Sequence, residues 1–210
     1  MAQKFVAREH ELLIKQVDDA VAAQGLHGDE KDWYYSSKDD EFDRLCNTFP
    51  RIVYGSTLVT ACSFFESSLV DLCKAFDRDS ELVKVKPWRD LSDKGGGVKN
   101  AADFLKANFK IELSRHPHWE TIIDYFKIRN CVAHANGDVS LMRGGEVEGA
   151  VKCHEGDGIS VDVDNRLKFG LEFVSTVIDQ LAALWPRLHA ACSKDEVLGP
   201  RYWPCSLGGP

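Results

Sequence analysis

The clearest hydrophobic pattern in the chain lies between Pro50 and Phe76. Apolar residues recur there at spacings of four and three, which is the period of one face of an α-helix. These residues are Leu58, Cys62, Phe65, Leu69, Leu72 and Phe76. The pattern predicts a long helix, running from about residue 50 to 76, whose apolar side faces the core.

Patterns of the same period predict four further helices. The last of them has a nearly regular apolar stripe that contains Pro186, and a proline inside a helix predicts a kink or an end. The predicted helices span residues 2–24 (ending at Gly25), 98–108, from Pro117 to the sequence HANG at 134–137, and 166–189.

The segments between these helices have no helical period. Residues 25–45 are polar and acidic, and we expect a loop there with at most one helical turn. Pro87 and the glycine run at 95–97 indicate a flexible connection. Apolar and polar residues alternate on both sides of the sequence EGDG, which predicts a β-hairpin over residues 147–163. We expect the tail, 191–210, to be irregular.

Together these elements predict a mainly helical fold with a small β-hairpin insertion before the last long helix. The chain has 210 residues, and we expect a single domain over residues 1–190 with its core at about 50–190. No apolar run is long enough to span a membrane, and the N-terminus shows no secretory signal. We therefore expect a cytoplasmic protein that does not bind a membrane.

Charge and cysteine content narrow the class of protein only slightly. The net charge is −7, but residues 84–129 contain ten Lys and Arg against six Asp and Glu. A locally basic segment can attract phosphate in an acidic protein, so a nucleic-acid partner is not excluded. The seven cysteines are odd in number and widely spaced, which favours reduced thiols over disulfides or a zinc site.

Two polar residues interrupt the apolar face of the helix that ends near residue 135. Ile122 and Phe126 precede Arg129 and Asn130 by three and four residues, so both polar side chains continue the apolar stripe. An unpaired buried guanidinium costs several kcal/mol. Arg129 should therefore face a carboxylate, a cavity or a partner chain.

Glu66 is the candidate carboxylate, because apolar residues also flank it on the long helix predicted over 50–76. Two interpretations remain open at this point: a buried ion pair that fixes how the helices dock, or a functional site. His134 favours the second interpretation, a functional site. It falls in the last helical turn before Asn136 and Gly137, where it can cap the helix or transfer protons.

The spacing of Arg129 and His134 constrains how they could work together. They lie five residues apart, which places them ~140° apart around a regular helix. They converge only if the helix distorts after Arg129, or if two copies of the chain meet. The second possibility predicts a homodimer with a composite site.

The sequence from Arg129 to His134 resembles the signature of the HEPN superfamily of α-helical ribonucleases and nucleotide-binding domains, in which four to six residues separate an Arg from a His. The resemblance covers residues 50–190 and implies an antiparallel helical bundle. It further implies a metal-independent endoribonuclease, often a toxin or phage-defence protein restrained by an antitoxin or inhibitor. By this resemblance Arg129 and His134 are the essential pair, and Asn130 and Glu66 are supporting residues.

The residue types fit this chemistry without a cofactor or metal. RNA carries its own nucleophile, the 2′-hydroxyl, so His134 would move protons while Arg129 stabilises the phosphate and Asn130 orients either group. The predicted products carry 2′,3′-cyclic phosphate and 5′-hydroxyl ends. The alternative is a catalytically silent HEPN-like module that binds RNA, a nucleotide or a protein.

Other candidate residues are better explained by structure. His116 and His118 fit a solvated loop better than a metal site, and Cys131 fits a small apolar core position.

Overall fold

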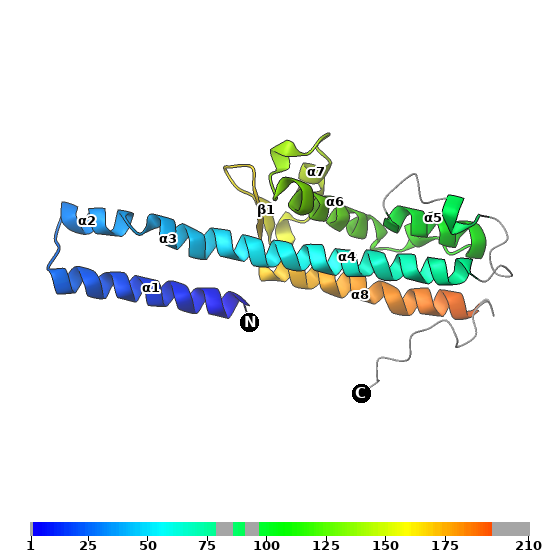
Figure 1. Ribbon diagram of the computed structural model, residues 1–210, viewed down its shortest axis with the longest axis horizontal. Coiled ribbons are helices and arrows are strands. Elements are labelled where there is room, and N and C mark those ends of the chain that lie inside the picture. The colour runs from blue at the N-terminus through cyan, green and yellow to red at the C-terminus, as the bar shows by residue number, and fades with distance from the viewer. Residues whose placement is uncertain (1, 79–85, 91–96, 195–210) are drawn as a thin grey trace, which may run out of the picture. The chain divides into compact units, whose positions relative to one another are not determined.

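The structure, a computed structural model, describes residues 2–78, 86–90 and 97–194 (Figure 1). These residues are mainly helical, with one small two-stranded sheet before the last helix, as predicted. Within the described ranges, no helix is both long and apolar enough to cross a lipid bilayer.

The α-helices differ widely in length, and short turns of other helix types lie between them. The α-helices are α1 (Ala2–Gln24), α2 (Asp29–Ser36), α3 (Asp39–Asp43), α4 (Phe49–Asp77), α5 (Gly97–Phe109), α6 (Trp119–Ala135), α7 (Glu146–Cys153) and α8 (Leu171–Lys194). The strands are β1 (Ile159–Val161) and β2 (Leu167–Phe169). The shorter turns are η1 (Arg44–Thr48, a π-helix) and the 3-10 helices η2 (Trp88–Asp90), η3 (Leu113–Arg115), η4 (Val139–Leu141) and η5 (Glu155–Asp157).

Contacts within the chain group it into two compact units. Unit 1 comprises Met1–Leu58 and Asn130–Ser175, and unit 2 comprises Val59–Arg129 and Thr176–Pro210. The boundaries fall inside α4, α6 and α8, so each of these helices contributes residues to both units. The single domain expected over residues 1–190 stays a prediction.

Aromatic side chains form the core of unit 2. Phe65 of α4 packs against Phe126 of α6 and Trp185 of α8, with ring centroids 6.3 and 5.7 Å apart. Phe104 and Phe109 of α5 form a second cluster at 5.9 Å. The predicted apolar stripe of α4 is buried, and Phe65 is 2% exposed. These contacts confirm that the stripe faces a core.

The β-hairpin in unit 1 differs from the predicted one. Residues 146–153 form helix α7, and β1 pairs in antiparallel fashion with β2, Ile159 opposite Phe169. The prediction of a strand within 147–153 was therefore wrong. Val147, Ala150 and Val151 are buried at helical spacing, whereas the sequence VEGAVKC also fits an alternating pattern over its short length. The last helix consequently begins at Leu171, after β2.

Two other predictions need correction, and for Pro186 one of the two predicted effects is excluded. A loop with at most one helical turn was expected over residues 25–45, but α2, α3 and the start of the π-helical η1 lie there. Helix α8 continues through Pro186 to Lys194, so the proline does not end it. Residues 191–194 of the expected irregular tail belong to this helix, and the remainder of the tail lies outside the described residues. The helices predicted at 2–24, 50–76 and 98–108 are confirmed as α1, α4 and α5.

Candidate active site

Arg129 of α6 contacts two side chains of α4. Its Nη2 donates a hydrogen bond to Ser63 Oγ at 2.8 Å and lies 3.6 Å from Glu66 Oε2. The side chains of Arg129 and Glu66 are 19% and 25% exposed, so the pair is largely shielded from water. The predicted pairing of Arg129 with Glu66 is confirmed.

Ser63 was not among the residues selected from the sequence. It lies three residues before Glu66, so both side chains project from the same side of α4 toward one neighbour. The spacing of three residues from Glu66 was the only sequence feature that could have identified Ser63 as a partner of Arg129. A serine within an apolar helix can have many other roles, so this feature is not sufficient. Its hydroxyl gives the guanidinium a fixed acceptor beside the carboxylate.

Gly97, the first residue of α5, leaves room for the Glu66 carboxylate. A Cβ at position 97 would lie 2.7 Å from Glu66 Oε1 and 3.1 Å from Val70 Cγ2. The carboxylate therefore lies against the N-terminal end of a helix, where the helix dipole favours negative charge. The close approach gives Gly97 a packing role. The rest of the glycine run, 95–96, lies outside the described residues.

The Gly97→Ala protein is expected to be less stable by about 1 kcal/mol. The added methyl group must displace the Glu66 carboxylate, and overpacking of this kind outweighs the higher helix propensity of alanine at a first-turn position. Urea unfolding of the two proteins, followed by circular dichroism, gives the difference.

Gly149 provides the matched control, because it lies within α7 and a Cβ there would meet nothing within 4 Å. Gly149→Ala should be neutral or stabilising by up to ~1 kcal/mol. In a Glu66→Ala background, Gly97→Ala should also become nearly neutral. An equal loss of stability with and without Glu66 would contradict the proposed contact between Gly97 and the carboxylate.

Two buried thiols near these residues are poor nucleophiles. Burial raises the pKa of Cys62 to about 12, although Arg129 lowers it and Glu66 raises it further. Burial, with the carboxylates of Asp138 and Glu148, raises the pKa of Cys131 to about 11. Both thiols stay protonated near neutral pH, and only the thiolate is a good nucleophile. The interpretation of Cys131 as an apolar filler is therefore supported.

The end of α6 in unit 1 carries Asn130 and His134. Asn130 is half-buried, whereas His134 is exposed in the last turn. The helix ends at Ala135, and Asn136 and Gly137 adopt left-handed φ values of 51° and 77°. The predicted stop is confirmed. The imidazole of His134 is accessible to solvent.

The four predicted site residues are thus distributed along one helix and its neighbour. Arg129 and Glu66 lie together in unit 2, while Asn130 and His134 belong to unit 1. Helix α6 continues without interruption from Trp119 to Ala135. The distortion that would bring Arg129 and His134 of one chain together is therefore not found in this helix.

The sequence around His116 and His118 has a local structural explanation. His116 Nδ1 accepts a hydrogen bond from the backbone N–H of His118 at 3.1 Å, just before α6 begins. Across the described residues, no three or more His, Cys, Asp or Glu side chains are grouped so that they could hold a metal ion. Within the described residues, neither His116 nor His118 therefore belongs to a group of possible metal ligands.

Comparison with known proteins gave no match, neither to a family model nor to a curated protein nor to a solved structure.

Proposed function

We propose that the protein is a metal-independent endoribonuclease of HEPN type. The observation that carries this proposal is the shielded Arg129, held by Glu66 and Ser63, on the same helix as an exposed histidine five residues further on. A guanidinium held in place by neighbours is pre-organised to bind a phosphate through two parallel hydrogen bonds. An exposed histidine can exchange protons with a bound substrate.

The reaction would begin with proton removal from an RNA 2′-hydroxyl. The 2′-oxygen then attacks the adjacent phosphorus, and the bond to the 5′-oxygen breaks as that oxygen gains a proton. His134 would transfer one of these protons, while Arg129 would stabilise the charge that develops on the phosphate oxygens. Asn130, one helical turn before His134, would orient the imidazole or the phosphate. The products carry 2′,3′-cyclic phosphate and 5′-hydroxyl ends.

The uninterrupted helix α6 supports a site shared by two copies of the chain. Five residues of a regular helix separate Arg129 and His134 by ~140°, so one phosphate is reached more readily by Arg129 of one protomer and His134 of another. The resemblance to the HEPN superfamily implies a toxin or defence protein restrained by an antitoxin or inhibitor, and the sequence, which shows no secretory signal, favours the cytoplasm as its location.

A second function is favoured by the contacts of Arg129 themselves. One nitrogen, Nη2, already meets both Glu66 and Ser63, which is also how an ion pair that only docks two helices would look. The corresponding function is a catalytically silent HEPN-like module that binds RNA, a nucleotide or a protein partner.

Incubation of the purified protein with RNA in EDTA separates the two functions. The nuclease should cleave a single-stranded RNA and leave 2′,3′-cyclic phosphate ends, which mass spectrometry identifies by their mass relative to the hydrolysed 3′-phosphate. An oligonucleotide of the same sequence with 2′-deoxyribose at every position is the control, because it lacks the nucleophile. Cleavage of both oligonucleotides, or of neither, would contradict the proposed reaction.

A further inference from the structure

The N-terminal part of unit 1 is a helical arm, residues 2–48 (Figure 1). Few of the side chains of residues 8–48 are buried. Helix α1 lies beside α2, α3 and η1, yet these three segments contain no buried residue. From residue 8 to residue 48 the buried side chains are Leu13, Val17 and Val21, all on α1. Helices as short as α2 and α3 are marginal alone and gain their stability from packing.

An apolar groove lies in unit 1 between α1 and the segment from Glu41 to Phe49, the first residue of α4. The groove has a volume of about 670 Å³, and its apolar lining includes Leu12, Leu45 and Phe49. Leu12 and Phe49 are each 41% exposed. Leu45 lies in η1, and π-helical turns within longer helices are frequent at functional sites. A groove of this kind between two helices accepts the apolar face of a third helix.

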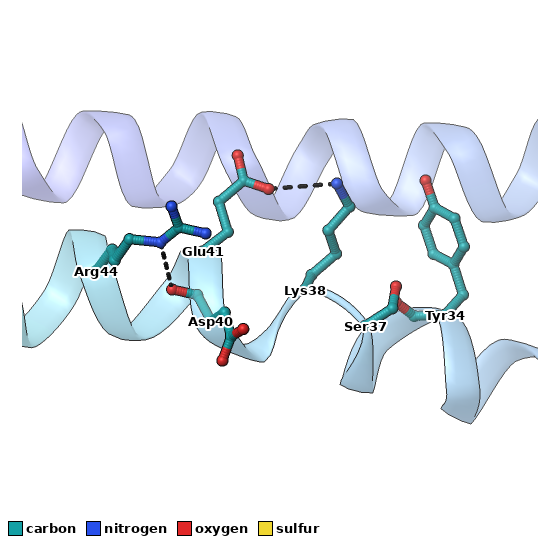
Figure 2. A network of polar contacts seen from close by, with 6 residues as sticks. All are labelled: Tyr34, Ser37, Lys38, Asp40, Glu41 and Arg44. Atoms are coloured by element: carbon teal, nitrogen blue, oxygen red, sulfur yellow. Dashed lines mark hydrogen bonds and ion pairs between the residues drawn. The ribbon is translucent and has the colours of Figure 1, made fainter.

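Charge indicates which kind of helix fits. Residues 1–50 contain eleven Asp and Glu against six Lys and Arg, so they carry most of the net charge of −7. Glu9 and Glu41 lie on the groove, with Arg44 as its one basic lining residue. Figure 2 shows that the Arg44 guanidinium bonds the backbone of Asp40 and that Lys38 pairs with Glu41. The hydrogen bond to a backbone carbonyl leaves the charge of Arg44 in place, and Lys38 offsets the charge of Glu41. The attraction for a cation therefore comes from the acidic excess of residues 1–50 as a whole.

A second copy of the chain is a poor occupant of the groove. Two arms brought face to face would juxtapose two strongly acidic segments, and like charges oppose such an association. We infer that the groove between α1 and the η1 region binds a basic amphipathic helix of a different protein. Its apolar residues would cover Leu12, Leu45 and Phe49, and its Lys or Arg residues would face Glu9 and Glu41.

The test uses a synthetic amphipathic helix of Leu and Lys, ~18 residues long, with Leu at helical spacing. Fluorescence anisotropy of the labelled peptide should show binding to the full-length protein with a Kd on the order of 10 µM. The Leu12→Gln/Phe49→Gln protein should bind about tenfold more weakly, because two apolar contacts are lost. Leu141→Gln, at a residue 68% exposed outside the arm, is the matched control and should bind as the wild type does.

A second variant tests the charges without changing the apolar lining. Glu9→Gln/Glu41→Gln should weaken binding severalfold at low salt and reduce its dependence on salt concentration. A peptide of the same composition in scrambled order, and one with Glu in place of Lys, should bind at least tenfold more weakly.

Three outcomes would overturn the proposal. One is equal binding by the wild type and both groove variants. Another is equal binding of the scrambled peptide, which would show attraction by charge alone. The third is a shift from dimer to monomer in the sedimentation of Leu12→Gln/Phe49→Gln, which would assign the groove to a second copy. None of these measurements depends on RNA cleavage.

Discussion

RNA incubated in EDTA with the His134→Ala protein is expected to be cleaved at least ~100-fold more slowly than with the wild type. A positioned proton-transfer group contributes on the order of 10²–10⁴ in rate, and alanine cannot replace it. His134 is exposed in the last turn of α6, so its removal should leave the fold intact. The measurement is the initial rate of appearance of cleaved RNA under single-turnover conditions.

His118→Ala is the matched control for His134→Ala. His118 is exposed just before α6, and its side chain has no role in the proposed reaction. This protein should cleave RNA at the wild-type rate. If His134→Ala and the wild type cleave equally fast while both remain folded, His134 is not the proton-transfer group.

Mixing two inactive variants tests whether the site is shared between copies. In a heterodimer of Arg129→Ala and His134→Ala, one composite site lacks both groups and the other retains both. After equal amounts have exchanged subunits, random pairing should restore about a quarter of the wild-type activity. A mixture as inactive as its components, although sedimentation shows mixed dimers, would place Arg129 and His134 of one chain in the same site.

Much of this site could be predicted because burial restricts residue choice most strongly inside helices. The α4 stripe and the polar interruption at Arg129 follow from helical period alone, and the energetic penalty of a buried guanidinium leads to Glu66. Ser63 and Gly97 could not be identified in this way. A serine is compatible with either side of a helix, and the glycine run gives no indication that one member approaches a carboxylate.

The errors in the fold have a common physical origin. Helices α2 and α3 have five to eight residues, no buried side chain and weak apolar periodicity, so the sequence contains little to distinguish them from a loop. Helix α7 is equally short, and its Val147 and Val151 fit either period. In α7, where Val147, Ala150 and Val151 are buried, tertiary packing selects the helix, and packing is not visible in the local sequence.

Glu66→Ala is expected to lower the free energy of unfolding by about 2–3 kcal/mol. The Arg129 side chain is 19% exposed and would keep Ser63 but lose its carboxylate partner. Removal of one member of a fully buried pair costs about 3–5 kcal/mol, and the partial exposure of this pair reduces that value. Urea unfolding of the two proteins measures this change in the free energy of unfolding. The comparison is valid if both proteins have the same m-value.

A double-mutant cycle isolates the pair from the separate effects of each side chain. Glu66→Gln and Arg129→Met should together cost less than the sum of the two single changes, with a coupling of at least about 1 kcal/mol. The cycle on Lys38 and Glu41 is the control. That pair is 3.2 Å apart with side chains 35% and 52% exposed, and surface pairs of this kind couple by about 0.5 kcal/mol or less. Equal coupling in the two cycles would show that Glu66 does not hold Arg129.

The same variants show whether Glu66 only positions Arg129 or also takes part in the reaction. If Glu66 only positions the guanidinium, Glu66→Gln should retain cleavage within about tenfold, because the amide oxygen can still accept a hydrogen bond. Arg129→Met should lose cleavage by ~100-fold or more, because no group remains to stabilise the phosphate charge. A silent module predicts a different result, in which both changes alter stability and no variant, nor the wild type, cleaves RNA. Stability and cleavage measured on one set of proteins therefore distinguish a docking ion pair from a phosphate-binding arginine.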